Sequence, residues 1–161
     1  MYNQDFSPGK DQPQGNRLKL VGFYLGPEEY AVDILKIKEI KLMQEITNVP
    51  KAPDFVEGVI NLRGDIVPII DLKKKLNLGE AQINEETKII VVEIDMKMVG
   101  VIVDEVTEVI EIEDSQLSAP PPIIGGIEAQ YLKGVGKLGD RLLILLDLDK
   151  ILTQEEKQQL V

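Results

Sequence analysis

The chain reads YAVDILKIKEI at residues 30–40 and VGVIVDEVTEV at residues 99–109, and the two stretches align without a gap. A glutamate recurs at Glu39 and Glu108, and apolar residues recur at aligned positions: Val32/Val101, Ile34/Val103, Ile37/Val106 and Ile40/Val109. Farther along, residues 58–72 and 134–148 share glycine, valine, leucine and aspartate at identical offsets. Internal similarity of this kind predicts that one small β-module is present twice.

The spacing of strand-like runs predicts the architecture. Runs rich in Val, Ile and Leu are separated by turn residues roughly every 8–12 positions, a pattern that favours small closed barrels over an open sheet. We therefore expect an all-β fold of two pseudo-repeated five-stranded barrels packed side by side, with short helical turns and a short C-terminal helix. Because ligands and partners commonly bind between domains, the seam between the barrels is the first candidate functional site.

Composition and capping residues set the expected limits of the domain. Residues 1–16 are rich in Gln, Asn, Gly, Pro and Asp, which predicts a flexible tail. Asp71 is a candidate N-cap for a short helical turn, and Thr153 with Glu156 has the spacing of a capping box. The expected division is a tail over 1–16, a domain over 17–153 and a C-terminal helix or tail over 154–161, with the first barrel mainly in 29–82, the second mainly in 85–152 and a strand over 17–25 able to cross between them.

Charge and residue usage exclude several classes of function. The net charge is −10, with 28 acidic and 18 basic residues, so the chain repels nucleic-acid phosphates and anionic membranes. It has no Cys and no His, which removes disulfides, thiolate nucleophiles, histidine bases and nearly all zinc sites. We therefore expect no catalytic residue, no metal and no cofactor. With no signal-peptide pattern and no apolar run near the ~20 residues of a membrane span, we expect a cytoplasmic protein that does not insert into membranes.

Two motifs resemble enzyme sites but favour a structural interpretation. Gly134, Gly136 and Gly139 match the dinucleotide fingerprint, yet a buried strand follows them where that fingerprint requires a helix, so we predict a hairpin. The carboxylates over residues 104–114 could form a metal site or an acid/base pair. Acids alternate there with isoleucines along a predicted strand, which favours a solvated face.

The stretch EGVINLRGDIVPIIDL, at residues 57–72, predicts a tight hairpin in which Gly64 supplies the positive φ of the turn. This interpretation does not explain Arg63, a guanidinium beside the turn of an apolar hairpin. Such an arginine either pairs with a nearby acid or projects as a directional contact, and the spacing leaves both open.

Several stretches closely resemble the bacterial chemotaxis coupling (adaptor) proteins, the CheW family. The likeness covers roughly residues 17–153, and its most specific run lies between residues 50 and 64. The stretches that carry it are DILKIKEI (33–40), ITNVPKAPDFVEGVINLRG (46–64), IIDL (69–72), VGVIVD (99–104) and GDRLLIL (139–145). The resemblance implies two five-stranded SH3-like barrels. The same module occurs in a chemotaxis histidine kinase and in a receiver-fused scaffold, and the length of this chain favours the free-standing coupling protein.

The resemblance also implies a function. We expect a non-catalytic adaptor that couples chemoreceptor cytoplasmic helical tips to the regulatory domain of the sensor histidine kinase, in the cytoplasm and recruited to membrane-associated receptor arrays. The receptor-binding residues implied by the motifs are Ile37, Glu39, Arg63 and Val109. The kinase-binding residues implied are Ile46, Val49, Phe55 and Gly58.

Two alternatives come from other classes of protein. One is a small-barrel ligand-binding or hydrolytic domain that works through paired carboxylates at the seam. The other is a nucleic-acid-binding barrel, which the acidic charge and the aromatic content of 4% disfavour.

Overall fold

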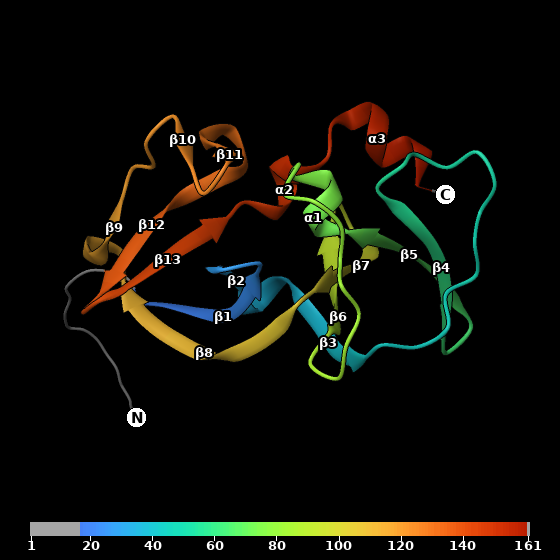
Figure 1. Ribbon diagram of the computed structural model, residues 1–161, viewed down its shortest axis with the longest axis horizontal. Helices are drawn as coiled ribbons and strands as arrows, with labels where there is room; N and C mark the ends of the chain where they lie inside the picture. Colours follow the sequence, from blue (N-terminus) through green and yellow to red (C-terminus); the bar gives the residue numbers. More distant parts are fainter. Residues whose placement is uncertain (1–16, 161) are drawn as a thin grey trace, which may run out of the picture.

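The computed structural model describes residues 17–160, and the tail expected over residues 1–16 lies outside them (Figure 1). Two β-sheets lie next to one another along the long axis of the molecule, accompanied by short helices. The prediction of an all-β fold is therefore confirmed. No helix within residues 17–160 is long and apolar enough to cross a membrane.

One sheet has six strands in the spatial order β8-β1-β2-β13-β12-β9, and the other has five in the order β3-β6-β7-β5-β4. The strands of the six-stranded sheet are β1 (Arg17–Leu25), β2 (Glu28–Asp33), β8 (Glu105–Glu113), β9 (Leu117–Ser118), β12 (Leu132–Leu138) and β13 (Arg141–Leu146). Those of the five-stranded sheet are β3 (Ile37–Leu42), β4 (Val56–Leu62), β5 (Asp65–Asp71), β6 (Lys88–Ile94) and β7 (Lys97–Val103). A separate hairpin joins β10 (Ile123–Ile124) to β11 (Ile127–Glu128).

The two sheets repeat one topology. In order, β8, β1, β2, β13 and β12 of the six-stranded sheet correspond to β3, β6, β7, β5 and β4 of the five-stranded sheet. The parallel strand pairs keep the register of the sequence alignment, because Leu145 lies opposite Ala31 and Ile69 lies opposite Gly100. The repeat predicted from the sequence is therefore also a repeat of structure.

The copies exchange strands, which corrects the barrel boundaries expected at 29–82 and 85–152. After β2 the chain leaves the six-stranded sheet and enters the five-stranded one as β3, and after β7 it crosses back as β8. The five-stranded sheet therefore takes its strands from residues 37–103, whereas β2 pairs with β13. Strand β6 is buried on both faces, so it lies between two apolar layers.

The two edges of each sheet are linked. Beyond β3, Thr47 exchanges backbone hydrogen bonds of 2.9 and 2.8 Å with Val59 of β4, the opposite edge strand. In the six-stranded sheet, β9 follows β8 and pairs with β12, where Ser118 lies opposite Val135. We call each linked sheet a barrel. Residues 45–49 form no strand of their own and contribute only the bridge at Thr47.

The core consists of three apolar clusters, one inside each barrel and the largest between them. Inside the five-stranded barrel lie Ile60, Leu62, Val67, Ile69, Ile89, Val91 and Ile102, and inside the six-stranded barrel lie Leu20, Ala31, Ile110, Ile112, Leu143 and Leu145. The third cluster combines Phe23 and Tyr30 of one barrel with Ile90 and Val92 of the other. Burial of this shared cluster joins the barrels into one unit, so partners can reach the seam only at its surface.

Short helices follow the last strand of each copy. They are α1 (Leu72–Lys75), α2 (Leu148–Ile151) and α3 (Gln154–Gln159), and the 3₁₀ turns are η1 (Ile34–Lys36), η2 (Asp114–Gln116) and η3 (Ala129–Tyr131). Asp71 caps α1 and Asp147 caps α2 through side-chain oxygens that accept backbone N–H groups. Thr153 and Glu156 form a capping box at α3. The predicted caps at Asp71 and Thr153 are confirmed.

Candidate functional site

An ion pair joins two of the residues implied to bind the receptor. Arg63 lies in the two-residue turn between β4 and β5, where its φ is 52° and that of Gly64 is 94°, as in the tight turns typical of hairpins. Its Nη2 donates a 2.8 Å hydrogen bond to Oε1 of Glu39 on β3. The Arg63 side chain is still 72% exposed. Arg63 therefore does both things that the sequence left open: it pairs with an acid and projects into solvent.

The pair sets the charge state of this surface. The hydrogen bond from Arg63 lowers the pKa of Glu39, assisted by the nearby charges of Arg63 and Lys41. The same hydrogen bond from the other side raises the pKa of Arg63. Lys41 Nζ lies 3.6 Å from the second oxygen of Glu39. Glu39 therefore presents a carboxylate held between two cations.

The six-stranded barrel contains a counterpart that the sequence analysis missed. Glu108, aligned with Glu39, accepts a 2.8 Å hydrogen bond from Arg141 Nη1. Arg141 also donates to both oxygens of Glu29, at 3.2 and 2.7 Å, and Thr107 donates to Glu29 at 2.8 Å. These bonds raise the pKa of Arg141 further above its ordinary value. The repeat in the sequence indicated Glu108, because Glu108 aligns with Glu39. It did not indicate Arg141, because the alignment of the two copies places Gly139 opposite Arg63.

The other two receptor candidates are apolar and differ in their burial. Ile37 begins β3 and is half-buried against the shared core. Val109 lies on β8 of the six-stranded barrel and is 56% exposed. Its aligned residue Ile40 is also exposed, and so is Leu42 farther along β3. The sequence predictions did not include Ile40 and Leu42, although the alternation of side chains along a strand places both on the face opposite Glu39.

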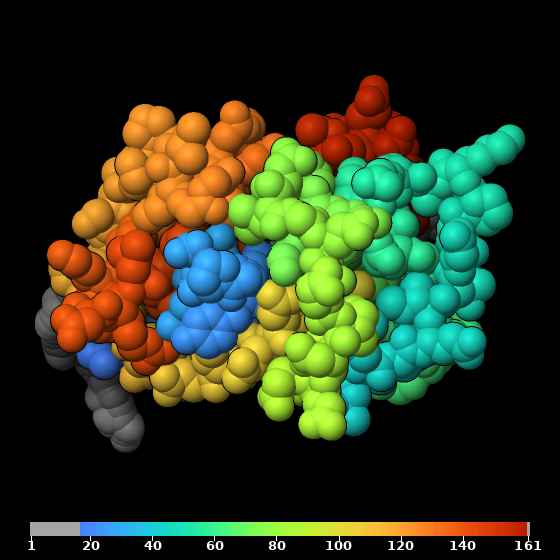
Figure 2. Space-filling view, viewed as in Figure 1, coloured from blue at the N-terminus to red at the C-terminus, as the bar shows by residue number. Residues whose placement is uncertain are grey.

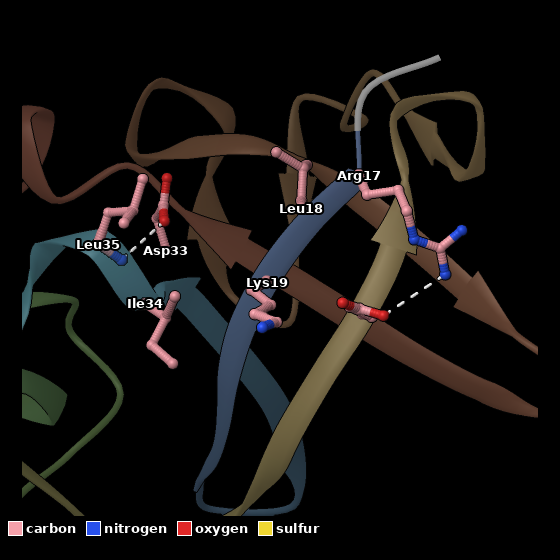
Figure 3. A pocket seen from close by; sticks show the side chains of 7 residues that line it. Arg17, Leu18, Lys19, Asp33, Ile34 and Leu35 are labelled. Atoms are coloured by element: carbon pink, nitrogen blue, oxygen red, sulfur yellow. Dashed lines mark hydrogen bonds and ion pairs between the residues drawn. The ribbon is translucent and has the colours of Figure 1, made fainter. Parts of the chain in front are cut away.

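A hollow of about 250 Å³ lies beside the start of β3 (Figure 3). It is lined by Arg17, Leu18, Lys19, Asp33, Ile34, Leu35 and Glu111. Both of its carboxylates are engaged, because Asp33 accepts a hydrogen bond from Leu35 N and Glu111 pairs with Arg17. Leu35 projects into solvent. The hollow is therefore lined by both apolar and charged side chains, and each of its acids already has a partner.

The residues implied to bind the kinase divide into surface and core. Val49 is exposed, and Ile46 is half-buried and lines a hollow of about 160 Å³ together with Ile83, which the sequence analysis did not single out. Phe55 packs against the shared core, and the Lys75 ammonium lies 5.4 Å from the centre of its ring. Gly58 is buried at a φ of 150°, against the carbonyl of Thr47.

Gly58 is therefore the buried member of this set, Ile46 and Phe55 are both half-buried against core clusters, and Val49 and Ile83 are exposed.

The two motifs that resemble enzyme sites are structural. The glycines of residues 134–139 lie in the β12–β13 hairpin, as predicted. On β8, Ile110 and Ile112 are buried while Glu111 is exposed, as the predicted solvated face requires, whereas Asp104 at the start of the acidic run is partly buried and pairs with Lys73. No group of three or more acidic side chains within residues 17–160 is arranged to hold a metal ion.

Comparisons with known proteins agree with this architecture. The family model of the CheW-like domain matches residues 19–156. The chemotaxis protein CheW of Klebsiella aerogenes is 42% identical over 134 residues, covering 83% of this chain and 81% of that protein. The chain belongs to the CheW family. The CheW of Treponema pallidum is 36% identical over 148 residues, covering 89% of this chain and 87% of its own.

A solved structure extends the comparison to the fold. The crystal structure of the scaffolding protein TtCheW from Thermoanaerobacter tengcongensis superposes with a TM-score of 0.80 at 36% identity, covering 90% of this chain and 92% of that one. The chain is therefore a member of a family of chemotaxis scaffold proteins that act in signal transduction.

Proposed function

We propose that this chain is a non-catalytic adaptor that couples chemoreceptor cytoplasmic tips to the sensor histidine kinase in signalling arrays. The observation that carries the proposal is the Glu39–Arg63 pair, a 2.8 Å contact in which the Arg63 side chain is 72% exposed and that of Glu39 is 26% exposed, two residues from Ile37 on β3. A charged pair sets the orientation of a partner, and exposed apolar residues supply contact area. A helical hairpin with apolar and charged residues on one face fits such a surface.

The receptor surface in this proposal comprises Ile37, Glu39, Arg63 and Val109. Ile37 comes from β3 and Val109 from β8, so both crossing strands contribute an apolar residue. A partner that contacts both strands would bury apolar surface from both barrels in one interface.

The kinase regulatory domain binds a second surface in this proposal, around Ile46, Val49 and Phe55, with Ile83 beside Ile46 and Gly58 buried against the Thr47 carbonyl. These residues surround the Thr47–Val59 bridge that links the edges of the five-stranded barrel. Two separate surfaces are the minimum that a coupling protein needs, since both partners must be held at once.

Reconstitution tests the proposal. The purified chain is added to receptor-bearing membranes and kinase, and we expect co-sedimentation of all three with receptor-dependent stimulation of the kinase. Titration of the chain with Mg²⁺, Ca²⁺ or nucleotides should leave its melting temperature unchanged. Failure to co-sediment with both partners would reject the adaptor, and a melting temperature that rises with a metal or nucleotide would favour a ligand-binding domain.

A further inference from the structure

The point where the chain crosses from β7 to β8 is held by a partly buried ion pair. Asp104 is the single residue between these strands, and its Oδ2 lies 3.4 Å from Lys73 Nζ on α1, with the two side chains 22% and 12% exposed. The same oxygen accepts a 2.7 Å hydrogen bond from Gly26 N in the β1–β2 turn, and Asp104 N donates to Tyr24 O at 3.0 Å. One carboxylate thus connects α1, the crossing segment and the first hairpin.

The other crossing point carries a similar pair with its charges exchanged. Lys36 ends η1, between β2 and β3, and its Nζ lies 3.2 Å from Asp149 Oδ2 on α2. The offset that aligns α1 with α2 places Lys73 opposite Asp149. At one crossing the helix provides the cation, and at the other it provides the anion. Lys36 and Asp149 are the more exposed pair, at 36% and 44%.

Both pairs lie at the start of an edge strand. Ile37, the first residue of β3, directly follows Lys36, and Glu105, the first residue of β8, directly follows Asp104. The helices that provide the opposite charges rest on the shared core, through Leu72 of α1 and Leu148 of α2. In the space-filling view, α1 and the segment after it lie over the boundary between the barrels (Figure 2). Each pair therefore ties the start of a crossing strand to the centre of the molecule.

We propose that Lys73 and Asp104 are positioning residues for the receptor surface, and that Lys36 and Asp149 repeat this role more weakly. The receptor surface of the proposed function combines β3 and β8, so its geometry depends on where each strand leaves the opposite barrel. We call Lys73–Asp104 the inner pair and Lys36–Asp149 the outer pair. The inner pair is only 12–22% exposed, so solvent screens it less than the outer pair. The inner pair therefore has the larger effect on the geometry of the receptor surface. This inference rests on the proposed adaptor function only where it is tested by binding to the receptor and the kinase.

If the inner pair is broken, Asp104 has few other contacts that could hold its carboxylate in place. Asp104 Oδ1 is buried and accepts no hydrogen bond within residues 17–160. Without Lys73, the carboxylate keeps only the Gly26 N–H, and a partly buried charge with one donor favours a rearranged or more solvated crossing segment. The change would move the start of β8 and with it Val109, whereas Asp71 and Lys74, which line the hollow beside Ile46, keep their own partners, Ala81 N and Glu57.

Two measurements test the proposal. The chain has no Cys, so cysteines introduced at the exposed Ile83, beside the five-stranded barrel, and Ile123, in the β10–β11 hairpin beside the six-stranded barrel, can carry spin labels for distance measurement. Lys73→Met keeps the apolar stem and removes the charge, whereas Lys73→Arg keeps the charge. Asp104→Asn keeps an acceptor for Gly26. Lys36→Met and Asp149→Asn are matched controls at the outer pair. Without labels, each variant is titrated with a receptor-tip fragment and with the kinase regulatory domain.

We expect Lys73→Met and Asp104→Asn to broaden or shift the distance distribution and to weaken receptor binding about five- to tenfold, while kinase binding stays within about twofold. Lys73→Arg should behave as the unmodified chain, and the outer variants should show smaller effects. An unchanged distance distribution, or equal weakening toward both partners, would overturn the proposal. If the unmodified chain does not bind the receptor fragment, the proposed function fails, and the distance measurement still decides whether Lys73 and Asp104 position the barrels.

Discussion

Arg63 Nη2 and Glu39 Oε1 lie 2.8 Å apart and join the turn of the β4–β5 hairpin to the opposite edge strand of its barrel. Arg141 and Glu108 make a contact of the same length in the other barrel. The two arginines differ in what lies behind them: Arg141 also binds Glu29, whose side chain is only 7% exposed, whereas the Arg63 side chain is 72% exposed and its partner Glu39 is 26% exposed. Arg141 is thus tied to a buried carboxylate, and Arg63 is not tied to one as deeply buried.

This difference predicts opposite effects for two equivalent substitutions. Arg63→Ala removes an exposed ion pair, and exposed pairs contribute little to stability, so the melting temperature and circular dichroism should change little. Affinity for a receptor-tip fragment should fall by roughly tenfold, since a directional charged contact is lost. A large loss of stability would show that Arg63 is needed to hold the barrel together.

Arg141→Ala is the matched comparison. It leaves the buried carboxylate of Glu29 with Thr107 but without its guanidinium. A buried charged acceptor that loses its partner costs about 1–3 kcal/mol, so denaturant unfolding should show a clear drop in the free energy of unfolding. The Glu29→Gln/Arg141→Ala double variant should recover part of that loss, because the uncompensated charge is gone. No recovery would mean that Arg141 stabilises the barrel through packing.

The pKa of Glu39 provides a test that needs no partner. In the folded chain the Arg63 hydrogen bond holds it below the ordinary value of 4.5. A depressed pKa means that the contribution of Glu39 to stability is complete above about pH 4.5 and is lost as pH falls through the lower folded value. NMR titration of the carboxyl carbon should show the depression, and Arg63→Ala should raise the pKa toward 4.5. Identical titration curves in both proteins would contradict the pair in solution.

The sequence predicts the repeated module, the hairpins and the helix caps because each depends on residues close together in the chain. The two-residue turn at Arg63 and Gly64 and the cap at Asp71 are of this kind. The exchange of strands could not be predicted, since a repeat defines its unit but not the copy with which each strand pairs. The contact between Arg141 and Glu29 joins residues 112 positions apart and depends on that exchange.

Two aligned glycines provide a further prediction, although only one of them has an unusual backbone. Gly58 has a φ of 150°, and a Cβ there would collide with the Thr47 carbonyl, which belongs to the bridge linking the barrel edges. Gly58→Ala should cost at least about 1–3 kcal/mol and increase hydrogen exchange at Thr47 and Val59. At Gly134 a Cβ would lie 3.0 Å from the Ser118 carbonyl, a tight contact that a small shift relieves.

Gly134→Ala should therefore be milder than Gly58→Ala in thermal unfolding. Binding of the kinase regulatory domain should weaken for Gly58→Ala even at temperatures where the variant is folded, because the surface around Ile46 and Val49 is built on this bridge. If Gly58→Ala keeps full stability, the bridge does not depend on the glycine. If it loses stability but keeps kinase affinity, the kinase surface lies elsewhere.

Charge reversal at Glu39 separates the two proposed surfaces most directly. Glu39→Lys places a third cation beside Arg63 and Lys41, which lie 2.8 and 3.6 Å from the two oxygens of the native carboxylate. The side chains would move apart, and a receptor base that pairs with Glu39 would meet a like charge, which is strongly unfavourable in an interface. We expect receptor-tip binding to be nearly abolished, with kinase binding intact, in titrations against each partner.

Glu108→Lys is the control, since Glu108 holds the aligned position in the other barrel and pairs with Arg141. Because Arg141 keeps its bonds to Glu29, this control should reduce receptor binding less than Glu39→Lys. Equal weakening toward receptor and kinase by Glu39→Lys would reject the model of two surfaces, and unchanged receptor affinity would remove Glu39 from the site.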